Sequence, residues 1–336
     1  MAETPAQHRP KLYPPPQFPP RRAPLFATTP PAIFPPILGL LGLAAALRVG
    51  TQAWGLGAEL ADLADLAAGL VLPLWAFAFC TYIGKMLRRT SVILDDLKVL
   101  PSRAGLAAGT LGGLVAAGHL AIFAPGAGLV LLLAMLGAHG VLALLTLRVL
   151  IGSPPEARQV NPGWHMTFVG FILAAPVLAS LGWPDVARLI LYATLPIALA
   201  IWGVSLVQLA RRTPPAPLRP LLVIHLAPAS LFATTASLAD VPTLALVFSG
   251  IAVLILVTLL AMAHWITESG FSALWGAFTF PLAATSTALM LQGGALGQLG
   301  QGILVLALGI IPWIAWRVLK QWPGGRLAAK TNAAEA

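Results

Sequence analysis

The chain has 336 residues, of which 58% are hydrophobic and only 9% are charged, and its mean hydropathy is +0.86. This number of charged groups is too small to cover the surface of a soluble protein, and the composition therefore excludes an ordinary soluble domain. The formal net charge of +9 does not indicate nucleic-acid binding, because the basic residues are scattered and form no continuous patch. The single cysteine, Cys80, excludes an intrachain disulfide and a cysteine-based metal site.

The N-terminal segment is rich in proline and basic groups, as in Pro14-Pro15-Pro16 and Arg21-Arg22. No apolar run precedes residue 32, so the segment does not resemble a signal peptide. We expect a disordered, Pro-rich cytoplasmic tail over residues 1–31 and a cytoplasmic C-terminal tail over residues 319–336. A role of the first tail in binding a partner remains an alternative.

Between the two tails the chain is a series of apolar blocks of about 20 residues, which is the length of a helix that crosses a bilayer. We therefore expect an all-α integral membrane protein with a single ten-helix transmembrane domain over residues 32–318. The predicted spans lie near residues 32–49, 60–84, 103–123, 126–150, 163–182, 185–209, 219–238, 241–264, 273–291 and 300–318.

The basic residues alternate between the breaks that separate these spans. Of the 20 Lys and Arg residues, only Arg48 and Arg188 fall on the side opposite to the others. This bias places both termini in the cytoplasm, because cytoplasmic loops carry the excess of basic residues. The odd spans begin at intervals of roughly 55–70 residues, which indicates five copies of one helical hairpin.

Proline occurs inside four of the five odd spans, at Pro35, Pro36, Pro176, Pro228 and Pro281. Proline removes a backbone donor and kinks a helix, and the freed carbonyl needs protein or water as a partner at membrane depth. This pattern predicts that the odd spans line the interior of the protein. Proline and glycine are also common in transmembrane helices in general, and three even spans contain proline, so the ordinary interpretation stays open.

Acidic residues are absent from the middle of the predicted spans, which argues against a cation pathway and against a typical ion-coupled carrier. All five odd spans begin at the predicted cytoplasmic side. Their partly positive N-termini, together with Arg103 and Arg219, are expected to form a cytoplasmic mouth that concentrates anions. The histidines show no spacing typical of haem or metal ligands and indicate hydrogen bonds between helices. We therefore expect no cofactor and no metal.

Four stretches resemble the inner helices of one transporter family. They are Asn161-Pro162-Gly163-Trp164, Leu218-Arg219-Pro220 with the following His225-Leu226-Ala227-Pro228, Trp275-Gly276-Ala277-Phe278-Thr279-Phe280-Pro281-Leu282 and Phe34-Pro35-Pro36. The sequence over about residues 26–318 is similar to the tellurite-resistance/dicarboxylate transporter family. This TehA-like family includes plant slow anion channels and yeast malate and sulphite transporters.

The resemblance implies a homotrimer in which each protomer is a quasi-five-fold ring of helical hairpins around a central pore. It also implies that a phenylalanine of the ninth span closes this pore. The matching residue is Phe280, and Phe278 is the competing residue. The expected pore-lining residues are Phe34, Pro36, Phe168, Pro176, Pro228, Thr235 and Pro281. The third span has no internal proline and departs from this pattern.

We therefore predict an anion channel or facilitated transporter of the bacterial inner membrane, with the lipid bilayer and small anions as its partners. It would pass small monovalent anions, dicarboxylates or oxyanions such as tellurite through a phenylalanine-gated pore. A proton-linked exporter of dicarboxylate, sulphite or tellurite is the alternative. A membrane haem protein or enzyme is the alternative of another class, which the shortage of buried acid–base groups disfavours, and we expect no catalytic residues.

Overall fold

The computed structural model describes residues 24–55 and 58–336, and these residues form helices and loops without any β-strand. Within them, nine helices are long and apolar enough to cross a membrane. The remaining predicted span, the fifth, corresponds to a shorter apolar helical stretch, His165–Ser180. The predicted all-α membrane class is confirmed, and the count of ten crossings stays a prediction. The expected N-terminal tail lies mostly outside the described residues.

The helices of the spans have these bounds: α1 (Phe34–Ala53), α2 (Ala58–Arg88), α4 (Leu100–Phe123), α5 (Pro125–Ile151), η3 (His165–Val169), η4 (Gly170–Leu173), α6 (Ala174–Ser180), α7 (Pro184–Arg211), η5 (Ala216–His225), α8 (Leu226–Leu238), α9 (Pro242–Ala261), η6 (Ala273–Phe278), α11 (Thr279–Met290) and α12 (Gly294–Leu319). Short helices lie before, between and after them: η1 (Pro31–Ile33), α3 (Val92–Lys98), η2 (Pro155–Arg158), α10 (Ala263–Thr267) and α13 (Arg326–Lys330).

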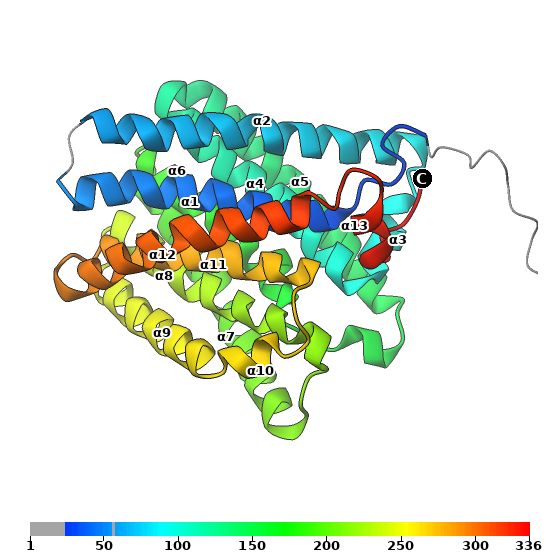
Figure 1. Cartoon of the computed structure of the whole chain (residues 1–336). Helices are drawn as coiled ribbons and strands as arrows, with labels where there is room; N and C mark the ends of the chain where they lie inside the picture. The colour runs from blue at the N-terminus through cyan, green and yellow to red at the C-terminus, as the bar shows by residue number, and fades with distance from the viewer. Residues whose placement is uncertain (1–23, 56–57) are drawn as a thin grey trace, which may run out of the picture.

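Consecutive spans pack as five hairpins: α1 with α2, α4 with α5, α6 with α7, α8 with α9, and α11 with α12 (Figure 1). The first helix of each hairpin also packs against the first helix of the next hairpin. These contacts run from α1 to α4, α6, α8 and α11, and then from α11 back to α1. The five odd spans therefore close into a ring, and their partner helices surround it.

Burial separates the inner helices from the outer helices. In the four longer inner spans, 61–72% of the most apolar stretch is buried, whereas in the outer helices the buried share is only 22–39%. The outer helices expose large apolar side chains such as Leu70, Leu144 and Leu254, as expected for helices that face lipid. The prediction that the odd spans lie inside is confirmed.

A change of helix type explains the prolines of the inner spans. In four of these spans a 3₁₀ segment precedes the α-helical part, and the third α-helical residue is proline: Pro36, Pro176, Pro228 and Pro281. Proline has no N–H to bond the carbonyl one turn earlier, and its ring crowds that carbonyl. The turn before the proline therefore tightens to 3₁₀ geometry. At the expected kinks, these spans therefore show a transition from 3₁₀ to α-helix just before the proline. The helix α4 lacks such a proline and is α-helical from Leu100.

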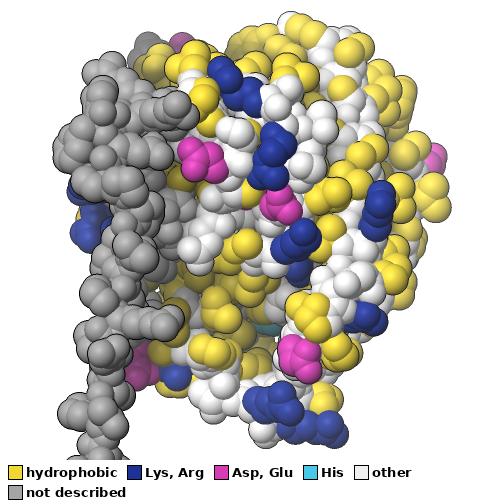
Figure 2. All heavy atoms as spheres, turned by 90° about the vertical axis from the view of Figure 1, so that its right-hand side faces the viewer, with side chains coloured by type: hydrophobic (Ala, Val, Ile, Leu, Met, Phe, Trp, Pro, Cys, Tyr) yellow, Lys and Arg dark blue, Asp and Glu magenta, His cyan; other side chains and the backbone are white. Residues whose placement is uncertain are grey.

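One end of the ring carries most of the positive charge. In the described part of the chain, every Lys and Arg residue except Arg48 and Arg188 lies near the ends where the inner spans begin. We call this end the basic face. It lies to the right in Figure 1 and faces the viewer in Figure 2, which shows Lys and Arg side chains spread over it.

Candidate functional site

Two cavities lie within the ring of inner spans. The proximal cavity, on the side of the basic face, has a volume of about 60 Å³ and an almost entirely apolar lining. All five inner spans contribute to this lining, for example through Leu38, Ala104, Val169, Leu231 and Phe280. Its position and lining make it a narrow, dry section of the ring axis.

The distal cavity lies toward the opposite end of the ring and has a volume of about 370 Å³. Its lining also comes from all five inner spans, and it includes polar side chains such as Arg48, His119, Ser180, Thr234 and Thr287. The two cavities together follow the ring from the basic face toward the opposite end. A solute that moves along the ring axis would have to pass through both.

Phe280 lies between the two cavities. Together with Leu173 and Leu231 it lines both of them. The Phe280 side chain is only 8% exposed, and a Cβ atom at Gly42 would lie 2.8 Å from Phe280 Cδ2, so the ring rests closely against α1. Three apolar side chains therefore form the boundary between the cavities, and such a constriction opposes ion passage because it offers no hydration.

Phe278, the competing residue, lies in η6 and lines neither cavity. Its ring packs against Trp275 with a centroid separation of 5.4 Å. At the second α-helical position, immediately before the transition proline, three inner spans carry Pro35, Ala175 and Ala227, whereas α11 carries the large Phe280. The geometry therefore distinguishes the two phenylalanines and favours Phe280 as the residue on the axis.

Three of the expected pore-lining prolines border the cavities. Pro228 and Pro281 line the proximal cavity, and Pro176 lines the distal cavity. Each belongs to a different inner span and marks the start of an α-helical part. The transition prolines thus lie close to the ring axis in three of the five spans.

The other four expected lining residues border neither cavity, and their role in lining a pore stays a prediction. They are Phe34, Pro36, Phe168 and Thr235. The Phe34 ring packs between α1 and α2, with its centroid 6.5 Å from that of Phe79. In each case an adjacent residue lines a cavity instead: Pro35, Val169 or Thr234. Successive helical residues point about 100° apart, so a shift of one residue moves a side chain from the axis into the surrounding core.

The two arginines expected at the mouth are held by other groups, and neither lines the proximal or the distal cavity. Arg219 forms an ion pair with Glu268, and its guanidinium lies 4.3 Å from the centroid of the Trp265 ring. Arg103 is only 6% exposed, and its Nε donates a hydrogen bond of 2.8 Å to the Leu97 carbonyl. Both arginines still add positive charge near the basic face.

Arg48 is a basic residue of the distal cavity that the sequence interpretation did not select. It lines the distal cavity and forms an ion pair with Asp65 of α2. The signal for it was a basic residue near the end of an apolar span, matched by an acidic residue near the start of the next span. Such intramembrane charges commonly pair with each other and mark ion pathways.

The buried histidines form hydrogen bonds between helices, as the sequence indicated. His165 Nε2 lies 3.0 Å from His225 Nδ1, His139 Nδ1 lies 2.8 Å from Thr110 Oγ1, and His119 Nε2 lies 3.0 Å from the Leu41 carbonyl oxygen. Over residues 24–55 and 58–336, no three His, Cys, Asp or Glu side chains gather into a group that could hold a metal ion.

The comparison with known families identifies one match. Residues 28–319 match the family described as SLAC1, voltage-dependent anion channel. The matched region contains the whole ring of inner spans, both cavities and Phe280, and leaves out only the two ends of the chain. No curated protein matches the chain.

Proposed function

Because the chain belongs to the voltage-dependent anion channel family, we propose that it passes small anions along the axis of its ring, with Phe280 as the closing residue. The observation that carries this proposal is the position of Phe280 between the proximal and distal cavities. The aromatic ring fills the axis at the level where Leu173 and Leu231 also approach it. An anion would lose its water shell there and gain no polar partner, so the path stays closed until the ring moves.

The charge distribution favours anions over cations. In the described residues, no Asp or Glu lines the proximal or the distal cavity, while Arg48 lines the distal one. The N-terminal ends of the inner spans all lie at the basic face, and each helix N-terminus carries about half a positive charge. The end of the axis at the basic face is therefore electropositive, which raises the local concentration of anions there, while at the other end Arg48 forms an ion pair with Asp65.

A proton-linked exporter of dicarboxylate, sulphite or tellurite is the second candidate. It is favoured by the titratable imidazoles of His165 and His119, which line the proximal and the distal cavity respectively. Histidine is a residue type that proton-coupled mechanisms use, so each cavity contains a candidate for that role.

We further propose that the protein is a homotrimer of the bacterial inner membrane with both termini in the cytoplasm. The excess of Lys and Arg at the basic face supports this orientation. Reporter fusions at Gly182 and after Lys330 should then give opposite compartment signals. The mass of the detergent-solubilised particle should correspond to three protomers, and a monomer that conducts would refute the need for a trimer.

The function itself is tested by reconstitution of the full chain into liposomes. Chloride, nitrate, malate, sulphite and tellurite are offered one at a time, with and without a pH gradient. The channel proposal predicts anion currents that reverse at the anion equilibrium potential and do not depend on the pH gradient. Flux that requires a pH gradient would instead support the proton-linked exporter, and absence of flux for every anion, both in the unmodified chain and in Phe280→Ala, would contradict both.

A further inference from the structure

A third cavity opens on the basic face, beside the ring axis. It has a volume of about 810 Å³ and lies between the start of α4, residues 156–162, the end of α7, and η5. The inner helices α1 and α11 contribute no lining residue, whereas the outer helix α7 forms one wall. We call it the lateral cavity, because its walls place it outside the ring. Figure 2 looks onto the basic face, over which Lys and Arg side chains are spread.

The lining of the lateral cavity is strongly basic. Among the described residues, Glu156 is the one acidic side chain that lines it, against four basic side chains: Lys98, Arg103, Arg211 and Arg212. Arg103 is almost completely buried, and its hydrogen bond to the Leu97 carbonyl fixes its guanidinium in the wall. Charges in such a recess are less screened than charges on an open surface, so the cavity attracts anions.

Two buried polar side chains of the same wall lack partners. Ser205 is 5% exposed and His225 is 8% exposed, and both line the lateral cavity. Within the described chain, Ser205 Oγ and His225 Nε2 have no hydrogen-bond partner. Buried polar groups in native proteins are almost always paired, so two buried polar atoms without partners in a basic recess indicate a missing polar ligand. Neither group has a role in the conduction path proposed above.

We propose that the lateral cavity binds a phosphate-bearing anion. Guanidinium groups form paired, charge-assisted hydrogen bonds with phosphate oxygens, and two of the four basic residues, Arg211 and Arg212, are exposed at the rim where such a group would enter. The cavity is much larger than the proximal cavity, so it can hold a polyvalent anion and its water. The ligand is either a soluble phosphate compound or the headgroup of an anionic lipid, since α7 ends at the basic face close to the bilayer surface.

The His165–His225 hydrogen bond places this site next to the pore. His225 lines the lateral cavity, and His165, its partner at 3.0 Å, lines the proximal cavity. A bound anion would therefore lie one hydrogen bond away from the wall of the proposed pathway. The site is nevertheless defined by binding alone, and it does not depend on whether the ring conducts.

Binding is measured on the full chain with two probes. Inorganic pyrophosphate is titrated by calorimetry into the detergent-purified protein, and lipid retention is measured by native mass spectrometry from vesicles that mix phosphatidylglycerol with phosphatidylcholine. Saturable pyrophosphate binding supports a soluble ligand, and selective retention of phosphatidylglycerol supports a lipid headgroup. Absence of both would overturn the proposal.

Variants assign the binding to this cavity. The double variant Arg211→Gln with Arg212→Gln should bind whichever of the two probes the unmodified protein binds about tenfold more weakly or worse. Each lost charged hydrogen bond is worth at least a severalfold change in the dissociation constant. Glu156→Gln should strengthen binding, because it removes the opposing carboxylate. All three residues are exposed, so the fold should survive their replacement.

The matched control is Lys320→Gln with Arg326→Gln. It also removes two exposed positive charges from the basic face, but these residues line a separate cavity together with Arg317 and Lys330. The affinity of this control variant for pyrophosphate or phosphatidylglycerol should stay within about twofold of that of the unmodified protein, because the lost charges are distant from the lateral cavity and screened. An equal loss in both double variants, or no effect of Glu156→Gln, would show general electrostatic attraction and reject the site.

Discussion

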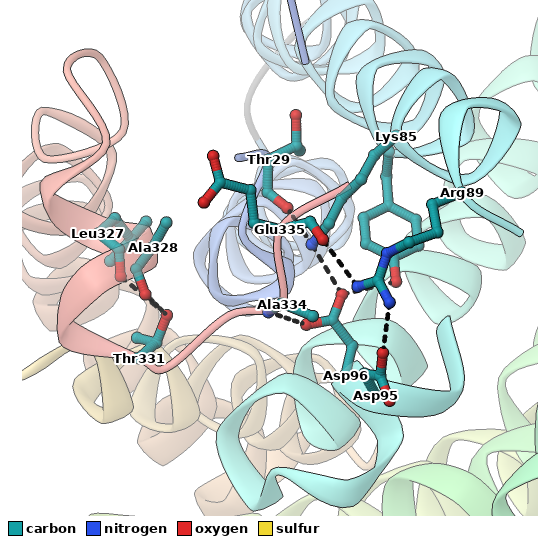
Figure 3. A network of polar contacts seen from close by, with 11 residues as sticks. Thr29, Lys85, Arg89, Asp95, Asp96, Leu327, Ala328, Thr331, Ala334 and Glu335 are labelled. Atoms are coloured by element: carbon teal, nitrogen blue, oxygen red, sulfur yellow. Dashed lines mark hydrogen bonds and ion pairs between the residues drawn. The ribbon is translucent and has the colours of Figure 1, made fainter. Parts of the chain in front are cut away.

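Lys85 and Asp96 form an ion pair that is completely shielded from solvent, with Lys85 Nζ 2.8 Å from Asp96 Oδ2 (Figure 3). The Tyr82 hydroxyl donates a hydrogen bond of 2.9 Å to the same oxygen, and Lys85 also donates to the Thr29 carbonyl at 3.1 Å. The other carboxylate oxygen accepts a hydrogen bond of 2.8 Å from the backbone N–H of Ala334. The Asp96 carboxylate thus connects α2, α3 and the C-terminal segment, and Lys85 adds the segment before α1 to this network.

Removal of the Asp96 charge should destabilise the protein strongly. Asp96→Asn leaves the buried Lys85 ammonium without its counter-ion, and breaking such a pair costs about 3–5 kcal/mol. Thermal unfolding in detergent measures the loss. Replacing both partners, as in Lys85→Met with Asp96→Leu, should recover part of it, because no buried charge remains although Tyr82 and the Ala334 N–H lose their acceptor. A double variant as unstable as Asp96→Asn would contradict this explanation.

Asp95 provides the matched control for Asp96. Its carboxylate pairs with Arg89 at 2.7 Å and Lys98 at 3.1 Å but is 39% exposed. The hydrogen bonds from Arg89 and then Lys98 lower the pKa of Asp95 below its usual value. The contribution of Asp95 to the stability of the folded state is therefore fully present at a pH above the ordinary pKa of the carboxyl group. It is lost as the pH falls through the lowered pKa of the folded state. Because exposed pairs are worth at most about 1 kcal/mol, Asp95→Asn should change stability by no more than that at neutral pH.

Gly39 sets the distance between α1 and α11. A Cβ at this position would overlap the side chain of Thr279, whose hydroxyl donates hydrogen bonds to the carbonyls of Gly276 and Pro35. Gly39→Ala should therefore force the two helices apart and cost about 1–3 kcal/mol. Gly137→Ala is the control, because a Cβ there meets no atom within 4 Å. Equal melting temperatures for the two variants would contradict the close packing.

The order and packing of the spans could be predicted from the sequence, because apolar runs and their prolines report on length and on inner position. The residue that faces the axis could not be predicted as well. The inner helices are apolar on all sides, so no polar stripe marks their orientation, and Pro35 lines a cavity where Phe34 was expected. Lys85 was interpreted as a loop charge, because its partner Asp96 lies in the short helix α3, which the sequence did not indicate.

Arg48 should control how readily anions enter the distal cavity. Arg48→Gln removes the basic side chain of that cavity, and in the Phe280→Ala background we expect the anion flux into liposomes to fall by about two- to tenfold. Asp65→Asn should raise the flux, because it removes the opposing charge of the ion pair. Arg188→Gln is the control, since Arg188 lies toward the same end but does not line the cavity. A larger effect of Arg188→Gln would reject the role of Arg48.

Phe280→Ala should open the proposed pathway. Truncation of the ring joins the proximal and distal cavities and removes the apolar barrier between them. A barrier lowered by as little as 1.4 kcal/mol raises a rate about tenfold, so we expect an increase of at least that size in anion flux. Since the vacated space faces existing cavities, the stability loss should be well below the roughly 3–5 kcal/mol typical of a buried Phe→Ala substitution.

Phe278→Ala is the paired control for Phe280→Ala. Phe278 packs against Trp275 and lines neither cavity, so its truncation should leave the anion flux low. Liposome flux and thermal stability are measured together for both variants. If Phe280→Ala lowers stability by several kcal/mol without any rise in flux, Phe280 is a core residue. If Phe278→Ala raises the flux instead, the pathway runs along η6, and the assignment of Phe280 is wrong.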